Sequence, residues 1–174
     1  MGRKSPENSK RQPWYVWILL ILFLAGTAWG TRYWLSPSFG LYEDDLTFIP
    51  SAIESDFNGV VDMISGYFST LAQQGRPLMW SWVALHAHLG WNLGGLQGMY
   101  FIAFAIWFVN ILLFVLYLRR IQGSFLFCVV GGLAYVVFSA DTTQAFLFNA
   151  FGLQTAITFL LIALHIYLNK GELR

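Results

Sequence analysis

The sequence predicts an all-α polytopic membrane protein with four transmembrane helices and amphipathic helices in its first outer loop. Two features of the composition point to this fold class: hydrophobic residues make up 57% of the 174-residue chain, and charged residues only 11%. A soluble domain of this length carries roughly a quarter charged residues. The third feature is the pattern along the chain, in which apolar runs of membrane-spanning length alternate with polar segments.

The first predicted span covers residues 14–35 and follows a basic cytoplasmic tail, residues 1–13. Trp and Tyr residues mark both of its ends, as is typical of rings that lie at the membrane interface. The alternative is a cleaved signal peptide, with Gly26-Thr27-Ala28 as a weak cleavage-like site. The run is longer than the usual core of a signal peptide, so we expect it to remain as a membrane anchor.

Three further spans are predicted at residues 95–118, 124–140 and 145–168. The links between them are only a few residues long, so consecutive helices should be antiparallel neighbours. The chain continues into a short polar cytoplasmic end, residues 169–174.

The distribution of Lys and Arg predicts the orientation. If the N-terminus lies in the cytoplasm, the outer side holds only Arg32 and Arg76 of the ten basic residues. The other eight fall on the cytoplasmic side: Arg3, Lys4, Lys10, Arg11, Arg119, Arg120, Lys170 and Arg174. This bias follows the positive-inside rule and places both ends of the chain in the cytoplasm.

Residues 36–93 form the only long connection, and long loops on rigid scaffolds often carry function. The apolar spacing over residues 53–70 predicts an amphipathic helix on the membrane surface, with Ser51 or Ser55 as its cap. A second helical segment, residues 78–89, is separated from the second span by Gly90, Gly94 and Gly95. It is either a juxtamembrane helix or the slanted start of that span.

Acidic residues follow the first span closely, as Glu43-Asp44-Asp45. Asp44 or Asp45 could act as a general base on an acceptor hydroxyl. The two together could instead hold a divalent cation through their oxygens, the one cofactor that the sequence suggests. Arg76 has a guanidinium group suited to a phosphate. The plain alternative is that the acidic residues are solvated surface charges and that Arg76 snorkels or caps a turn.

The order of these features resembles the start of a known superfamily. A first span, the acidic triplet, a surface helix and Gly75-Arg76-Pro77-Leu78 before the second span look like the GT-C superfamily of membrane glycosyltransferases. The closest likeness is to the glucosyltransferase branch that decorates bacterial surface polysaccharides. The resemblance covers residues 14–168 and only the N-terminal portion of such an enzyme.

The resemblance implies a multi-pass protein of the bacterial inner (plasma) membrane. It would transfer a sugar from a polyprenyl-phosphate donor to a cell-surface glycan, lipid or protein acceptor. Asp44 or Asp45 would be the catalytic base, and Arg76 would contact the donor phosphate. Because family members usually have around ten or more spans, a partner membrane subunit is a further expectation.

Four other residues are candidates for a supporting role: Glu43, His86, His88 and Asp141. The two histidines are two positions apart, so on a helix they point about 200° from one another and cannot easily chelate one metal ion. They are expected to pack at the interface, or else to bind a sugar or phosphate. Asp141 would cap the last span or face the site.

The spans carry few polar groups. Asn110, Asn149 and Gln154 are expected to form hydrogen bonds between helices, and the last two could also line a cavity below the outer loop. The central parts of the spans lack Asp, Glu, Lys and Arg, which argues against an ion-coupled transporter. A lipid-flipping protein and a non-catalytic accessory protein remain as alternatives. The partners are thus membrane lipid and a lipid-linked sugar, with nothing that suggests nucleic acid.

Overall fold

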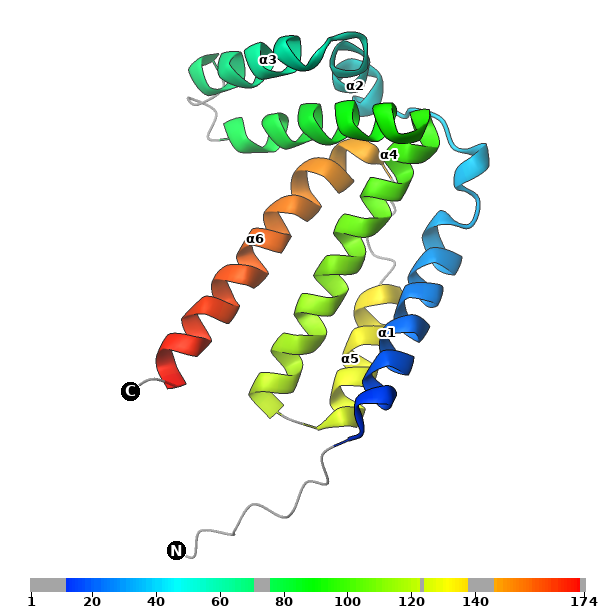
Figure 1. Cartoon of the computed structure of the whole chain (residues 1–174), viewed down its shortest axis with the longest axis vertical. Helices are drawn as coiled ribbons and strands as arrows, with labels where there is room; N and C mark the ends of the chain where they lie inside the picture. The colour runs from blue at the N-terminus through cyan, green and yellow to red at the C-terminus, as the bar shows by residue number, and fades with distance from the viewer. Residues whose placement is uncertain (1–11, 71–75, 123, 138–145, 173–174) are drawn as a thin grey trace, which may run out of the picture.

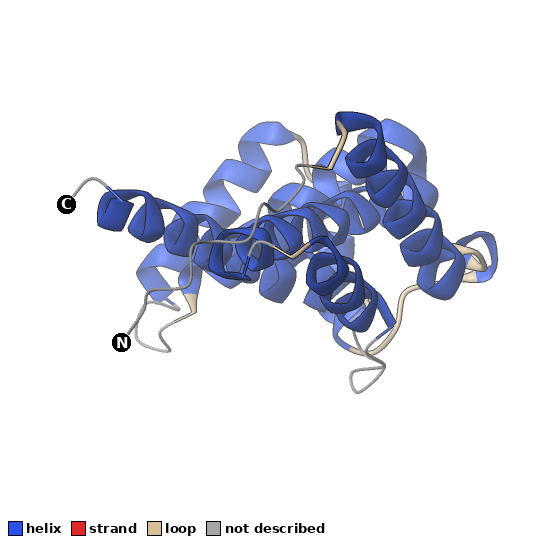
Figure 2. Cartoon of the chain, turned by 90° about the horizontal axis from the view of Figure 1, so that it is seen from below, coloured by secondary structure: helices blue, strands red, loops and turns tan. Residues whose placement is uncertain are grey.

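The computed structural model describes residues 12–70, 76–122, 124–137 and 146–172. All regular structure in these ranges is helical, and Figure 2 shows only helices and their connections there. The elements in chain order are α1 (Trp14–Ala28), the π-helix η1 (Trp29–Tyr33), the 3₁₀ helix η2 (Ser36–Ser38), α2 (Asp44–Glu54), α3 (Phe57–Thr70), α4 (Pro77–Gln122), α5 (Phe125–Val137) and α6 (Leu147–Glu172). The predicted all-α class is confirmed for this part of the chain.

Three helical stretches within the described ranges are long and apolar enough to cross a membrane: Trp14–Ser38, Pro77–Ile121 and Leu147–Asn169. They indicate a membrane protein. Four spans are predicted from the sequence, and α5 lies where the third of them is expected. It is apolar but has 13 residues, which is about 20 Å of helix against a hydrocarbon layer of roughly 30 Å.

The helices form two groups that lie across one another (Figure 1). One group, the bundle, contains α1, the second arm of α4 (residues 96–122), α5 and α6. The other group, the transverse layer, contains α2, α3 and the first arm of α4 (residues 77–93), and it covers one end of the bundle. The start of α1 and the end of α6 lie at the opposite end of the bundle.

Helix α4 belongs to both groups because it bends sharply at two glycines. Gly94 is extended and Gly95 has φ 59° and ψ −141°, a conformation that favours glycine. The two arms then meet closely: a Cβ atom on Gly90 would lie 2.6 Å from the Cα of Met99. The segment predicted at residues 78–89 is therefore a separate arm that lies across the bundle, and glycines define its end.

The helix predicted over residues 53–70 corresponds to α3, but its predicted start is wrong. Residues 53 and 54 belong to α2 instead, because Ser55 is extended (ψ 148°) and ends that helix. Neither Ser51 nor Ser55 caps α3: the Ser55 hydroxyl donates to the carbonyl of Ser51 at 2.8 Å. Asp56 caps α3 instead, since its carboxylate accepts the N–H of Gly59 at 2.8 Å.

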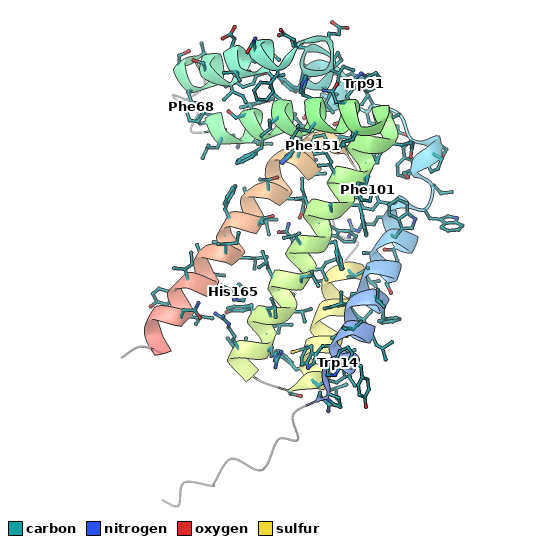
Figure 3. All side chains as sticks on the ribbon, in the orientation of Figure 1. Trp14, Phe68, Trp91, Phe101, Phe151 and His165 are labelled. Atoms are coloured by element: carbon teal, nitrogen blue, oxygen red, sulfur yellow. The ribbon has the colours of Figure 1, made fainter. Side chains whose placement is uncertain are left out.

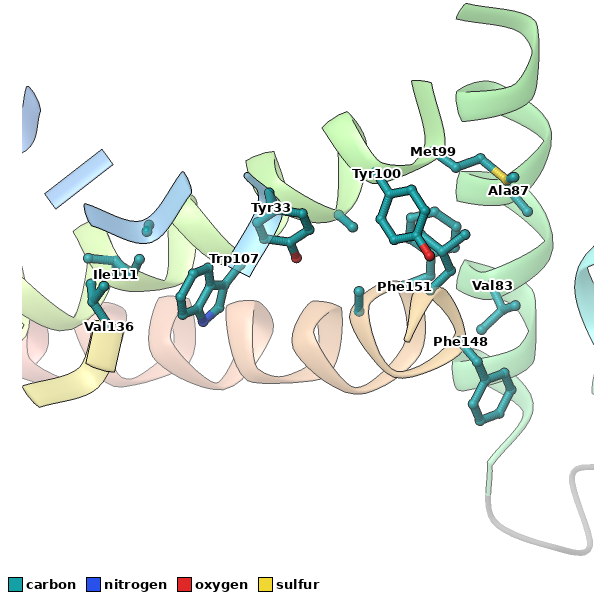
Figure 4. Close-up of a cluster of buried hydrophobic side chains, with 14 of the residues drawn as sticks. Tyr33, Val83, Ala87, Met99, Tyr100, Trp107, Ile111, Val136, Phe148 and Phe151 are labelled. Carbon is teal, nitrogen blue, oxygen red and sulfur yellow. The ribbon is translucent and has the colours of Figure 1, made fainter. Parts of the chain in front are cut away.

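The core of the bundle combines aromatic packing with one buried polar cluster. Tyr33, Tyr100, Trp107 and Phe151 point into the space between the helices (Figure 4). The polar cluster consists of Asn110 on α4 and of Gln154 and Thr158 on α6. The Asn110 amide donates to the backbone and side-chain oxygens of Gln154 at 2.9 and 3.0 Å, and the Thr158 hydroxyl donates to Asn110 Oδ1 at 2.6 Å. The expected interhelical hydrogen bonds are thus present for Asn110 and Gln154.

Aromatic and basic side chains mark the end of the bundle away from the transverse layer. Trp14 is 74% exposed at the start of α1 (Figure 3). Arg119 lies over the ring of Trp17, 4.4 Å from its centroid. Arg120 donates to the carbonyl of His165 at 3.1 Å. Exposed rings and cations of this kind suit a membrane interface.

Candidate functional site

The acidic triplet lies at the start of α2, where the backbone is strained. Glu43 has φ 44° and ψ −112°, an unusual conformation for a residue with a Cβ atom. Glu43 and Asp44 are exposed, whereas Asp45 is fully buried. The two adjacent aspartates therefore have very different surroundings. Strained residues such as Glu43 cluster at functional sites, where the surrounding structure holds them in place.

The carboxylate of Asp45 binds backbone N–H groups from two parts of the chain. Its Oδ2 accepts the N–H of Tyr42 and that of Leu147, both at 3.3 Å. Its Oδ1 accepts the N–H of Phe148 at 2.6 Å. Because Asp45 has no exposed surface, an acceptor hydroxyl has no route to it in this conformation.

Burial raises the pKa of Asp45 above its usual range, and the nearby carboxylate of Asp44 adds to the increase. The hydrogen bonds from Phe148, Tyr42 and Leu147 oppose this by stabilising the charged form, but burial has the larger effect.

Aromatic rings pack against one another on the segments that carry Asp45 and its bonding partners. Tyr42 stacks on Phe146 with ring centroids 5.8 Å apart. Phe48 lies 4.0 Å from Trp80 and 5.3 Å from Phe148, again between centroids. These rings join α2, the start of α6 and the first arm of α4 into one cluster. The acidic loop thus lies where aromatic side chains of three helices pack together.

Arg76 lies elsewhere, at the mouth of a groove between the first arm of α4 and α6. The groove has a volume of about 980 Å³. Arg76 and Asn149 supply its polar groups, and its other walls are mainly apolar: Pro77, Leu78, Met79, Trp82, Gly152, Leu153, Ala156 and Phe159. Neither Asp44 nor Asp45 lines it. The expectation that Asn149 borders a cavity agrees with this position.

The two histidines have different surroundings. His88 is buried and links two helices: its Nδ1 lies 3.3 Å from the carbonyl of Ala52 on α2, and its Nε2 lies 3.1 Å from the amide of Asn92. His86 stacks on Trp82, with centroids 5.4 Å apart. It lines a pocket of about 350 Å³ that also includes Trp82. His88 therefore has a packing role, whereas His86 borders a hollow next to the Arg76 groove.

Within the described ranges, no three His, Cys, Asp or Glu side chains are grouped as metal ligands. Asp44 and Asp45 remain the pair for which the sequence suggests a divalent cation. The bonds of Asp45 to N–H donors fit this role poorly, because donors point toward the place that a cation would occupy. Asp141, the remaining candidate, lies outside the described residues.

The sequence missed one part of this arrangement, which is the contact between Asp45 and the start of α6. Leu147 and Phe148, whose N–H groups bind Asp45, lie 102 and 103 positions after it in the chain. No local pattern indicates such a pairing.

The chain matches no known protein family, and neither curated proteins nor solved structures are significantly similar to it.

Proposed function

We propose that the chain is a membrane glycosyltransferase, or the N-terminal part of one, which resembles the GT-C superfamily. It would transfer a sugar from a polyprenyl-phosphate donor to a cell-surface glycan, lipid or protein. One observation carries the proposal: an exposed carboxylate lies on a strained loop of the transverse layer, and an apolar groove that Arg76 lines lies between this layer and α6. A lipid phosphate needs both a cation for its head and an apolar path for its tail.

Asp44 is the proposed base, because it is the exposed member of the aspartate pair. The acceptor hydroxyl oxygen attacks the anomeric carbon of the donor sugar and forms the new C–O bond. The bond between that carbon and the phosphate oxygen breaks, and its electron pair leaves with the lipid phosphate. Asp44 takes the hydroxyl proton.

Arg76 is the proposed contact for the donor phosphate, since a guanidinium group can bind two phosphate oxygens at once. The apolar residues Leu153, Ala156 and Phe159 continue the groove along α6. They would accommodate the first part of the lipid tail.

The proposed topology has four spans, with α5 as the third, and both chain ends in the cytoplasm of a bacterial cell. The transverse layer would then lie at the outer face of the inner membrane, where the polyprenyl-linked sugar is presented. The excess of Lys and Arg on the opposite side supports this orientation.

The test is transfer of a labelled sugar in membranes that carry the full-length gene, together with complementation of a deletion strain. We expect Asp44→Asn to reduce transfer by at least about a hundredfold, since general-base catalysis typically contributes this much. The matched control is Asp56→Asn, which changes another exposed aspartate in the same layer. Normal transfer by Asp44→Asn would exclude the mechanism and favour an accessory or lipid-flipping role.

A further inference from the structure

The N-terminus of α6 is bound by a carboxylate from a distant part of the chain. The first N–H groups of a helix have no partner within it. Asp45 accepts two of them, from Leu147 and Phe148, while the N–H of Ala150 donates to the carbonyl of Phe146 at 2.9 Å. A negative charge at this end of a helix is also favoured by the helix dipole. Asp45 thus performs the task of an N-cap for a helix to which it does not belong.

The same carboxylate also fixes the start of α2. It binds the N–H of Tyr42, and the N–H of Asp45 donates back to the carbonyl of Tyr42 at 2.8 Å. The strained backbone of Glu43 lies inside this small ring of bonds. Asp44 is exposed and directly precedes Asp45. The orientation of Asp44 therefore depends on the bonds that hold Asp45.

The first turn of α6 leads directly into the groove. Asn149, the residue after Phe148, lines the groove together with Gly152. The fit is close here: a Cβ atom on Gly152 would lie 2.7 Å from the Cγ of Met79 on the first arm of α4. A shift in the first turn of α6 would therefore change the groove wall that faces Arg76.

We propose that Asp45 is a positioning residue that joins the two halves of the site, holding Asp44 on one side and the wall of the Arg76 groove on the other. This inference rests on the proposed function for its catalytic consequence, but the structural link can be measured separately. Asp45 touches neither the sugar nor the phosphate. It acts through the start of α2 and the first turn of α6.

The first measurement is amide hydrogen exchange of the full chain in lipid nanodiscs, without any substrate. We expect Asp45→Ala to speed exchange at Leu147 and Phe148 by about threefold to thirtyfold, the factor that corresponds to the loss of a helix cap. Asp45→Asn should give a smaller increase, because its amide oxygen still accepts one N–H. The matched control is Asp56→Ala, which removes the cap of α3 and should leave α6 unchanged.

The second measurement is binding of farnesyl phosphate, a short polyprenyl phosphate, to the same samples. Asp45→Ala should weaken binding by about threefold or more, Asp45→Asn by less, and the control Asp56→Ala hardly at all. Arg76→Ala should abolish it.

The two measurements separate the possible failures. Unchanged exchange at Leu147 and Phe148 in Asp45→Ala overturns the inference. Faster exchange with unaltered binding of farnesyl phosphate overturns the link to the groove. If Arg76→Ala binds the probe as well as the wild type does, the proposed donor site is wrong, and the exchange result still decides whether Asp45 caps α6.

Discussion

The bundle and the transverse layer both bury polar side chains, but they satisfy them in different ways. In the bundle, Asn110, Gln154 and Thr158 are neutral and bind one another across two helices. In the transverse layer, Asp45 is ionisable, and its partners among the described residues are backbone N–H groups. Within a span, backbone N–H groups are already bonded to carbonyl groups of the same helix. The first N–H groups of a helix have no such partner and can bind a side chain.

This difference indicates which role the bundle and the transverse layer each have in the protein. In the polar cluster of the bundle, Asn110 binds both Gln154 and Thr158 across the interface of α4 and α6, which suits a scaffold. The transverse layer keeps exposed charges, Asp44 and Arg76, beside buried supports. The chemistry of the protein is therefore expected in the layer, and its stability in the bundle and at the bend that joins the two.

The largest effect is expected at the bend. Gly90→Val would place side-chain atoms against the backbone of Met99 on the other arm, and overpacking of this kind costs about 3 kcal/mol. Thermal unfolding in detergent, with the midpoint temperature as readout, measures the loss. The control is Gly26→Ala in α1, where a Cβ atom meets nothing within 4 Å. An equal midpoint for both variants would contradict the close approach of the two arms.

A smaller effect is expected in the bundle. Asn110→Leu removes the donor that binds the backbone and side-chain oxygens of Gln154. Polar contacts between membrane helices contribute about 0.6 to 2 kcal/mol. Unfolding of single and double variants with Gln154→Leu gives the coupling energy. Asn58→Leu, at an exposed position on α3, is the control, and additive effects of the two changes would show that the cluster does not bind α4 to α6.

The smallest effect is the pH dependence of the transverse layer. Because the pKa of Asp45 is raised in the folded state, the carboxyl group of Asp45 stays protonated in the folded chain at pH values where it has lost its proton in the unfolded chain. The resulting stabilisation of the folded chain is fully present below about pH 3.8, the ordinary pKa of this group. It is lost as the pH rises through the higher pKa of the folded state. Relative to Asp45→Asn, the wild type should gain stability when acidified from neutral pH. A difference in midpoint temperature that stays constant with pH would contradict this.

The sequence predicted the parts of the fold that depend on local pattern. Apolar runs located α1, the second arm of α4 and α6, and the glycines between residues 90 and 95 indicated a break. Composition could not show that the break is a sharp bend, because this depends on the contact between Gly90 and Met99. The split between α2 and α3 was missed, since the apolar spacing runs through Ser55 without a change.

The candidate site was predicted in its residues but not in its arrangement. The sequence singled out Asp44 and Asp45 together and could not distinguish them. Their separation depends on the strain at Glu43 and on N–H groups more than a hundred residues away. Arg76 was predicted from a short motif, while the groove beside it exists only because α6 packs on the first arm of α4.

The long separation between Asp45 and its partners has a consequence for synthesis. The acidic loop is made about a hundred residues before the first turn of α6, so in the nascent chain the carboxylate of Asp45 lacks its partners on that helix. The transverse layer can reach its final form only after α6 has been made. The order of translation thus makes the candidate site the last part of the described chain to mature, after the helices that support it.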